Sequence, residues 1–90
     1  MPTTTASSIG SKMVGTAIRS ARIRAGLTQA EVARQLGTAP SYVAKVELGG
    51  ANLTVGQLVN FANAMGVGVD VQFPEVSAEF RSLPRPAAAV

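Results

Sequence analysis

The sequence predicts an all-α domain of four helices, followed by one β-strand that pairs with the same strand of a second copy. Three observations support this fold class. Apolar residues recur every three or four positions in four segments, and glycines separate these segments. Two of the segments begin with the Thr-x-x-Glu or Thr-x-x-Gln pattern of a capping box. After Gly66 the apolar residues alternate with other residues, and this period of two is typical of a half-buried strand.

The first predicted helix follows a polar arm. Residues 1–10 are mostly small and polar and show no periodicity, so we expect a flexible arm there. The helical pattern begins at Lys12, and Gly26 ends it as a C′ glycine. Its apolar stripe comprises Val14, Ala17, Ile18, Ala21 and Ala25. The folded domain is therefore expected to begin at residue 11, and the strand described below ends it at residue 73.

Two short helices follow. Thr28 and Glu31 form a capping box that begins the second helix, predicted over residues 28–36. After a short turn, Pro40 stands at the first position of the third helix, where its missing N–H costs no hydrogen bond. This helix is expected to reach Leu48, where two glycines end it. The residues expected to be buried are Ala30, Val32, Ala33 and Leu36 in the second helix, and Val43 and Val46 in the third.

The fourth predicted helix begins with a second capping box, formed by Thr54 and Gln57. Gly66 ends this helix. Its apolar stripe comprises Val55, Leu58, Val59, Ala62 and Met65.

The segment after the fourth helix has the pattern of a strand, and Pro74 ends it. A single strand cannot satisfy its own backbone N–H and C=O groups. A two-fold axis makes one patch complementary to itself, so the simplest partner is the same strand of a second copy. The predicted homodimer interface comprises Val67, Val69, Val71 and Phe73. The alternative is a short fifth helix beginning near Val69. Residues 74–90 are expected to form a tail that is disordered or binds a partner.

The composition excludes most enzyme chemistry. The chain has no His and no Cys, so it lacks the usual zinc ligands, a Cys nucleophile, an imidazole base and a disulfide. Its carboxylates are spread singly, so no metal-binding cluster is apparent. We therefore expect no enzymatic activity, no catalytic residue, no metal and no cofactor.

The net charge of +3 favours a polyanionic partner. The excess of basic residues lies between residues 12 and 73, since the acidic residues of the tail balance its arginines. The alternative is a slightly basic surface that only maintains solubility. No run of 18 apolar residues occurs, and the first residues lack the apolar region of a signal peptide. We expect no membrane partner and a cytoplasmic location.

Two short helices joined by a turn that contains Gly, the second with polar residues on one face, match the description of a helix-turn-helix. The run GLTQAEVARQLGTAPSYVAKVELGG resembles the XRE (Cro and phage-repressor-like) family, and the similarity covers about Val14 to Gly66. This resemblance implies a lambda-repressor-like domain. It also implies double-stranded DNA as the partner, bound as a palindromic operator by a dimer.

The resemblance also implies roles for individual residues. Gln29 matches a glutamine that binds a DNA phosphate, and Arg22 and Glu47 match an ion pair between the first and third helices. The DNA-binding residues that it implies are Thr28, Gln29, Ala39, Pro40, Ser41, Tyr42, Lys45 and Arg22. Lys45 either reads guanine or contacts a phosphate. Tyr42 either reaches the DNA or covers the junction between helices.

The chain departs from the family pattern at three places. Pro40 replaces a frequent Gln, Arg or Ser, and Leu48 replaces a frequent Asn. The loop at residues 50–52 lacks the basic residue that usually contacts the DNA backbone. We therefore expect weak binding by a monomer, with specificity from two half-sites and from DNA shape.

The strand and tail are similar to those of the HipB and HigA antitoxins. This similarity implies an autorepressor whose tail, with Val76, Phe80 and Leu83, engages a toxin kinase or nuclease. A phage-type immunity repressor and a restriction–modification controller are alternatives with the same fold. A further alternative is a protein-interaction module that no longer reads DNA.

Overall fold

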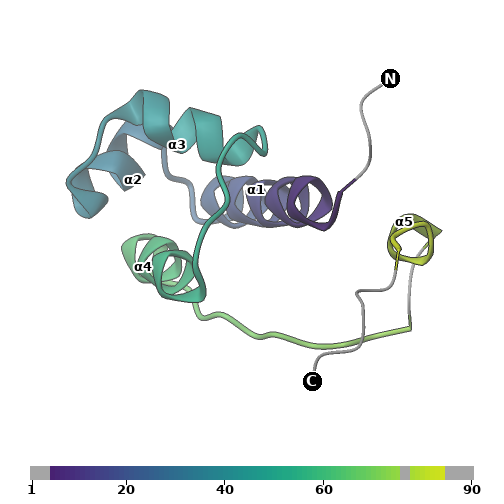
Figure 1. Ribbon diagram of the computed structural model, residues 1–90. Helices are drawn as coiled ribbons and strands as arrows, with labels where there is room; N and C mark the ends of the chain where they lie inside the picture. The colour runs from purple at the N-terminus through teal and green to yellow at the C-terminus, as the bar shows by residue number, and fades with distance from the viewer. Residues whose placement is uncertain (1–4, 76–77, 85–90) are drawn as a thin grey trace.

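The computed structural model describes residues 5–75 and 78–84. The helices of this part are α1 (Ala6–Arg24), α2 (Gln29–Leu36), α3 (Pro40–Glu47), α4 (Val55–Met65) and α5 (Ala78–Arg81). Both α1 and α2 pack against α3 on one side and α4 on the other (Figure 1). The four predicted helices are therefore present, and they form one all-helical domain. No helix of the described residues is long and apolar enough to span a membrane.

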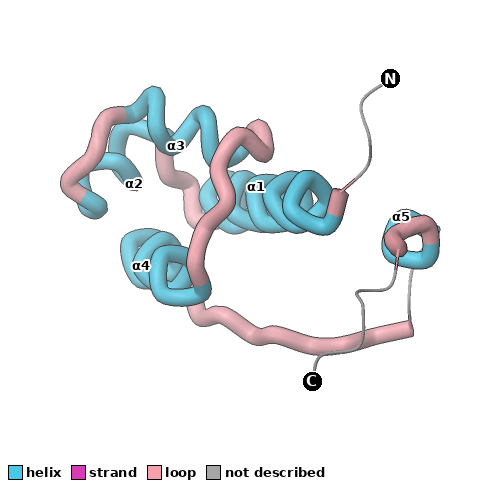
Figure 2. The backbone as a smooth tube through the Cα atoms, viewed as in Figure 1, coloured by secondary structure: helices cyan, strands magenta, loops and turns pink. Residues whose placement is uncertain are grey.

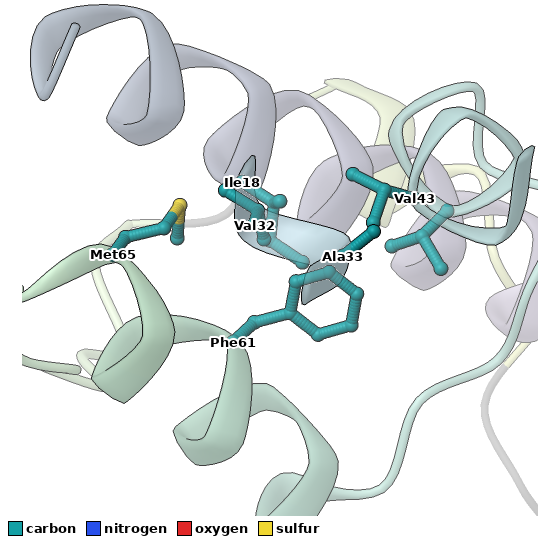
Figure 3. Packing of buried hydrophobic residues seen from close by; sticks show 7 residues of the cluster. Ile18, Val32, Ala33, Val43, Phe61 and Met65 are labelled. Atoms are coloured by element: carbon teal, nitrogen blue, oxygen red, sulfur yellow. The ribbon is translucent and has the colours of Figure 1, made fainter. Parts of the chain in front are cut away.

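The core lies where α1, α2, α3 and α4 converge. It consists of Ile18, Val32, Ala33, Val43, Val46, Phe61 and Met65 (Figure 3). Phe61 was not in the predicted stripe of α4, whereas Val55 and Val59 were predicted to be buried and are exposed. The observed stripe keeps the predicted Ala62 and Met65, and the larger Phe61 is buried in place of the two valines. Burial of a large side chain is worth about 1.5–3 kcal/mol, so that stripe faces the core.

Both predicted capping boxes are present. At α2 the backbone N–H of Thr28 donates to Glu31 over 2.9 Å, and that of Glu31 donates to the Thr28 hydroxyl over 3.0 Å. Thr54 and Gln57 make the same reciprocal pair at α4, over 2.8 and 3.0 Å. The glycine that ends each of these helices has a positive φ, so its lack of a Cβ is required there.

The first helix begins earlier than predicted. It starts at Ala6, and the Thr5 hydroxyl caps it by accepting a hydrogen bond from the Ser8 N–H over 3.0 Å. The prediction of a flexible arm is therefore wrong for residues 6–10, while residues 1–4 lie outside the described part. The first turn has no apolar stripe, so periodicity could not reveal it. The capping Thr was the available signal.

Helices α1 and α3 cross in direct backbone contact. A Cβ atom at Gly15 would lie 2.3 Å from the carbonyl oxygen of Val46 and 2.9 Å from that of Glu47. Only a residue without a side chain fits at this crossing. This contact therefore sets the short distance between α3 and α1.

The described residues contain no β-strand, so the strand predicted over residues 67–73 is absent in the single chain (Figure 2). The alternative fifth helix near Val69 is absent as well. The segment is an extended loop that leads from α4 toward α5 (Figure 1). The physical reason is that a strand needs a second strand to satisfy its backbone groups, and a single chain offers none.

The predicted tail contains the short helix α5. This helix lies against α1, and Phe80 lines a hollow there with Ile9, Met13 and Thr16. Disorder is therefore wrong for residues 78–81, which fold against the chain's own first helix. The predicted partner residue Val76 lies outside the described residues.

Candidate nucleic-acid interface

Helices α2 and α3 form the helix-turn-helix unit. Gly37 ends α2 with a φ of 69°, and Pro40 begins α3 after a short turn (Figure 1). On α3, Val43 and Val46 are buried, whereas Pro40, Ser41 and Lys45 are exposed. One face of this short helix therefore packs on the core, and the opposite face is free to meet a partner.

Glu47, at the end of α3, is the centre of a polar network. Arg22 on α1 donates to its carboxylate twice, from Nε to Oε2 over 2.6 Å and from Nη2 to Oε1 over 2.9 Å. The Arg22 Nη1 atom donates to the carbonyl oxygen of Leu27 over 2.9 Å. The Glu47 side chain is only 1% exposed and that of Arg22 12%. The ion pair expected from the sequence thus joins α1, the approach to α2 and α3.

Gln29 completes this network from the first residue of α2. Its Nε2 donates to Glu47 Oε1 over 3.1 Å. The side-chain amide, expected at a DNA phosphate, is therefore oriented by a carboxylate of the protein. An amide nitrogen carries two N–H donors, so one remains for a phosphate. Thr28, beside it, accepts the capping bond with its oxygen and keeps its hydroxyl proton free to donate.

The network keeps both partners of the ion pair charged. Burial raises the pKa of Glu47. The hydrogen bonds from Arg22 and Gln29, together with the charges of Arg22 and Arg19, lower this pKa by more than burial raises it, so the net shift is downward. The hydrogen bond to Glu47 raises the pKa of Arg22. The pair therefore stays ionised at neutral pH and holds α3 at a fixed angle to α1.

Tyr42 lies at the junction of α3 and α4. Its ring centroid is 6.2 Å from that of Phe61, with the rings tilted by 34°, and the side chain is half-buried against the core. Of the two roles considered for the ring, the structure favours cover of the helix junction. Ala39, at the N-cap of α3, is exposed.

Comparison with known protein families decides the class. A family model described as helix-turn-helix matches residues 18–72, which is more than half of the chain. The chain belongs to the XRE-type helix-turn-helix family. It is accordingly a DNA-binding transcription regulator, and α3 corresponds to the recognition helix. Searches of curated proteins and of solved structures returned no match.

Two cations of this helix-turn-helix protein, Lys12 and Arg19, were not among the residues expected at the site, and Lys12 shares a turn with the expected Lys45. Lys12 on α1 packs beside the turn that follows α3, since a Cβ at Gly49 would lie 2.8 Å from its Cγ. Lys45 packs on the other glycine of that turn, where a Cβ at Gly50 would lie 2.9 Å from its Cγ. Arg19 is exposed and close enough to lower the pKa of Glu47. No sequence pattern links position 12 to position 49, so only the packing of α1 on α3 reveals this site.

Within residues 5–75 and 78–84, no group of three or more His, Cys, Asp or Glu side chains could hold a metal ion.

Proposed function

We propose that this protein is a homodimeric autorepressor that binds a palindromic operator, with α3 of each copy in a major groove. The observation that carries the proposal is the exposed polar face of α3 beside the Arg22–Glu47–Gln29 network. In a helix-turn-helix the angle of the second helix decides which side chains reach the bases. A network that fixes this angle is therefore what a DNA-reading helix requires.

The groups around α3 support a division of roles. Thr28 and Gln29 stand at the start of α2, where the helix dipole and free N–H groups favour a phosphate. Arg22 uses three of its five N–H groups within the protein, so it retains donors for a second phosphate. Ser41 and Lys45 are the exposed polar side chains of α3 that can reach base edges.

The two lysines at the Gly49–Gly50 turn supply positive charge at a position that departs from the family pattern. The loop over residues 50–52 has no basic residue of its own. Lys12 and Lys45 flank it, and their side chains occupy the space that the glycines leave open. We therefore assign the phosphate contact of this loop to Lys12, while Lys45 can serve either this contact or a base edge.

A gel shift on the DNA upstream of the gene tests DNA binding. The logarithm of the binding constant should fall linearly with the logarithm of the salt concentration, because bound lysines and arginines release counterions. A Gln35→Ala variant, altered at an exposed residue of α2 outside the proposed contacts, should bind like wild type. No binding at about 50 mM salt, or a slope near zero, contradicts the proposal and favours the alternative of a protein-interaction module.

The proposal extends to an antitoxin role in a toxin–antitoxin operon. Its support is the apolar surface of the tail, where Phe80 of α5 is 41% exposed and lies outside the DNA-binding helices. Co-purification of the tagged protein with the product of the adjacent reading frame tests this role. An integrase or a methyltransferase gene at that place instead favours a phage-type repressor or a restriction–modification controller.

A further inference from the structure

We propose that residues 67–73 of two copies pair as antiparallel strands centred on Val71, which sets Phe73 of each copy beside Val69 of the other. This inference rests on the proposed homodimer and adds its register and contacts. The segment is extended and has no strand beside it in the described chain (Figure 2). Its backbone N–H and C=O groups can therefore pair with a strand of another chain.

The two faces of this segment differ in chemistry. The Nε2 atom of Gln72 donates to Asp70 Oδ2 over 2.5 Å, so these polar side chains share one face. In an extended chain the residues between and beside them point to the other face, which is therefore apolar.

The apolar face is covered at one end only. Val67 and Val69 are 40% and 39% exposed because they lie against α1 and α4. Val71 and Phe73, on the same face, are 64% and 96% exposed. An apolar face that continues beyond the body of its own chain needs cover from elsewhere, and a second copy supplies a matching face.

Charge decides the register. In a two-fold antiparallel pair, apolar residues lie opposite apolar residues only when the axis places one residue opposite its own copy. An axis midway between two neighbouring residues would place apolar residues opposite polar ones. An axis at Asp70 would place the carboxylates of both copies opposite each other, and like charges in this arrangement repel. An axis at Val71 instead places each Asp70 opposite Gln72 of the other copy. The hydrogen bond made within the single chain is then made between chains.

The same register fills a hollow beside α4. Val59, Ala62, Val67 and Val69 line this hollow together with Asn60 and Asn63, and Val59 is 48% exposed on the surface of α4. With the axis at Val71, Phe73 of the second copy lies opposite Val69, at the edge of the hollow. The most exposed aromatic ring of the described chain thereby gains apolar contacts with the valines of the other copy.

Disulfide trapping tests the register, because the chain contains no cysteine of its own. Directly opposite residues in an antiparallel pair have Cβ atoms about 4.5–5.5 Å apart, near disulfide distance, whereas diagonal neighbours are about 7–8 Å apart. After oxidation in a glutathione buffer, the yield of covalent dimer should be about fivefold higher for Val71→Cys than for Asp70→Cys. An equal mixture of Asp70→Cys with a size-tagged Gln72→Cys should form the mixed dimer.

Gln35→Cys, at an exposed site on α2, measures disulfides formed by random collision. A covalent dimer of Asp70→Cys that equals or exceeds that of Val71→Cys overturns the register. Trapping at the level of the collision control overturns the pairing itself, and sedimentation of the wild-type chain then tells whether it dimerises elsewhere or not at all. Gel shifts with reduced Val71→Cys report DNA binding separately, so loss of the register leaves the DNA-binding proposal to its own test.

Discussion

Arg22 and Glu47 join α1 to α3 through two hydrogen bonds of 2.6 and 2.9 Å between a guanidinium and a carboxylate. The carboxylate is nearly inaccessible to solvent, and Gln29 donates a third hydrogen bond to it. Three helices thus meet at one acidic group. The orientation of α3 therefore depends on this group as well as on the apolar core.

Replacement of Glu47 by Ala should destabilise the domain by roughly 3 kcal/mol or more, because it leaves the largely buried charge of Arg22 without a partner. Urea unfolding monitored by circular dichroism measures this loss. Glu31→Ala is a useful control, since that carboxylate is accessible and bonds only within its own capping box. A free energy of unfolding for Glu47→Ala equal to that of wild type would show that the ion pair carries no net stability.

The pH dependence of stability should follow the lowered pKa of Glu47. A carboxyl with a lowered folded-state pKa stabilises the fold above its ordinary value of 4.5, and this contribution is lost as the pH falls through the folded-state pKa. Glu31 acts in the same direction, because its hydrogen bonds with Thr28 lower its pKa. Unfolding free energies of wild type and Glu47→Gln, compared from about pH 7 to about pH 3, should converge at the acid end. A difference independent of pH contradicts this prediction.

Two glycines of α1 should respond to alanine in opposite directions. At Gly15 the added Cβ would meet the backbone of α3 at 2.3 Å, so Gly15→Ala should push the helices apart and cost about 1–3 kcal/mol or more. At Gly10 the added Cβ would meet no described atom within 4 Å beyond its own helix. Gly10→Ala should therefore stabilise the helix by about 0.5–1 kcal/mol. Thermal unfolding of the two variants checks the pair, and a stabilising Gly15→Ala would mean that α1 and α3 do not cross here.

These particular residues show what the sequence could and could not predict. Capping boxes and terminal glycines are local signals, so the bounds of α2 and α4 agree with prediction within one residue. The choice of Phe61 over Val55 and Val59 depends on which stripe of α4 meets the other helices, which periodicity alone does not decide. The position of Lys12 beside Gly49 depends on the crossing of two helices far apart in the chain.

The two capping threonines should separate stability from DNA binding. Each caps its helix with the same pair of hydrogen bonds, so Thr28→Ala and Thr54→Ala should each cost about 1 kcal/mol of stability. Thr28 also stands in the proposed phosphate site, whereas Thr54 begins α4, outside it. Gel shifts should therefore show weaker binding for Thr28→Ala only. Equal DNA affinity of the two variants would remove Thr28 from the proposed interface.

Lys12 and Lys45 flank the same turn, but they should affect DNA recognition differently. Lys12 lies on α1, away from the exposed face of α3, so Lys12→Ala should weaken binding to all sequences alike and reduce the salt slope by about one. Lys45 lies on the exposed face of α3, so Lys45→Ala should also relax the preference for the operator if its ammonium group reads guanine. Competition gel shifts with operator and scrambled DNA at several salt concentrations separate these effects. If Lys45→Ala lowers the affinities for operator and scrambled DNA by the same factor, Lys45 contacts only the phosphate backbone. Ser41 is then the remaining exposed polar side chain of α3 for base recognition. If Lys12→Ala leaves affinity and salt slope unchanged, Lys12 does not contact the DNA at the turn after α3.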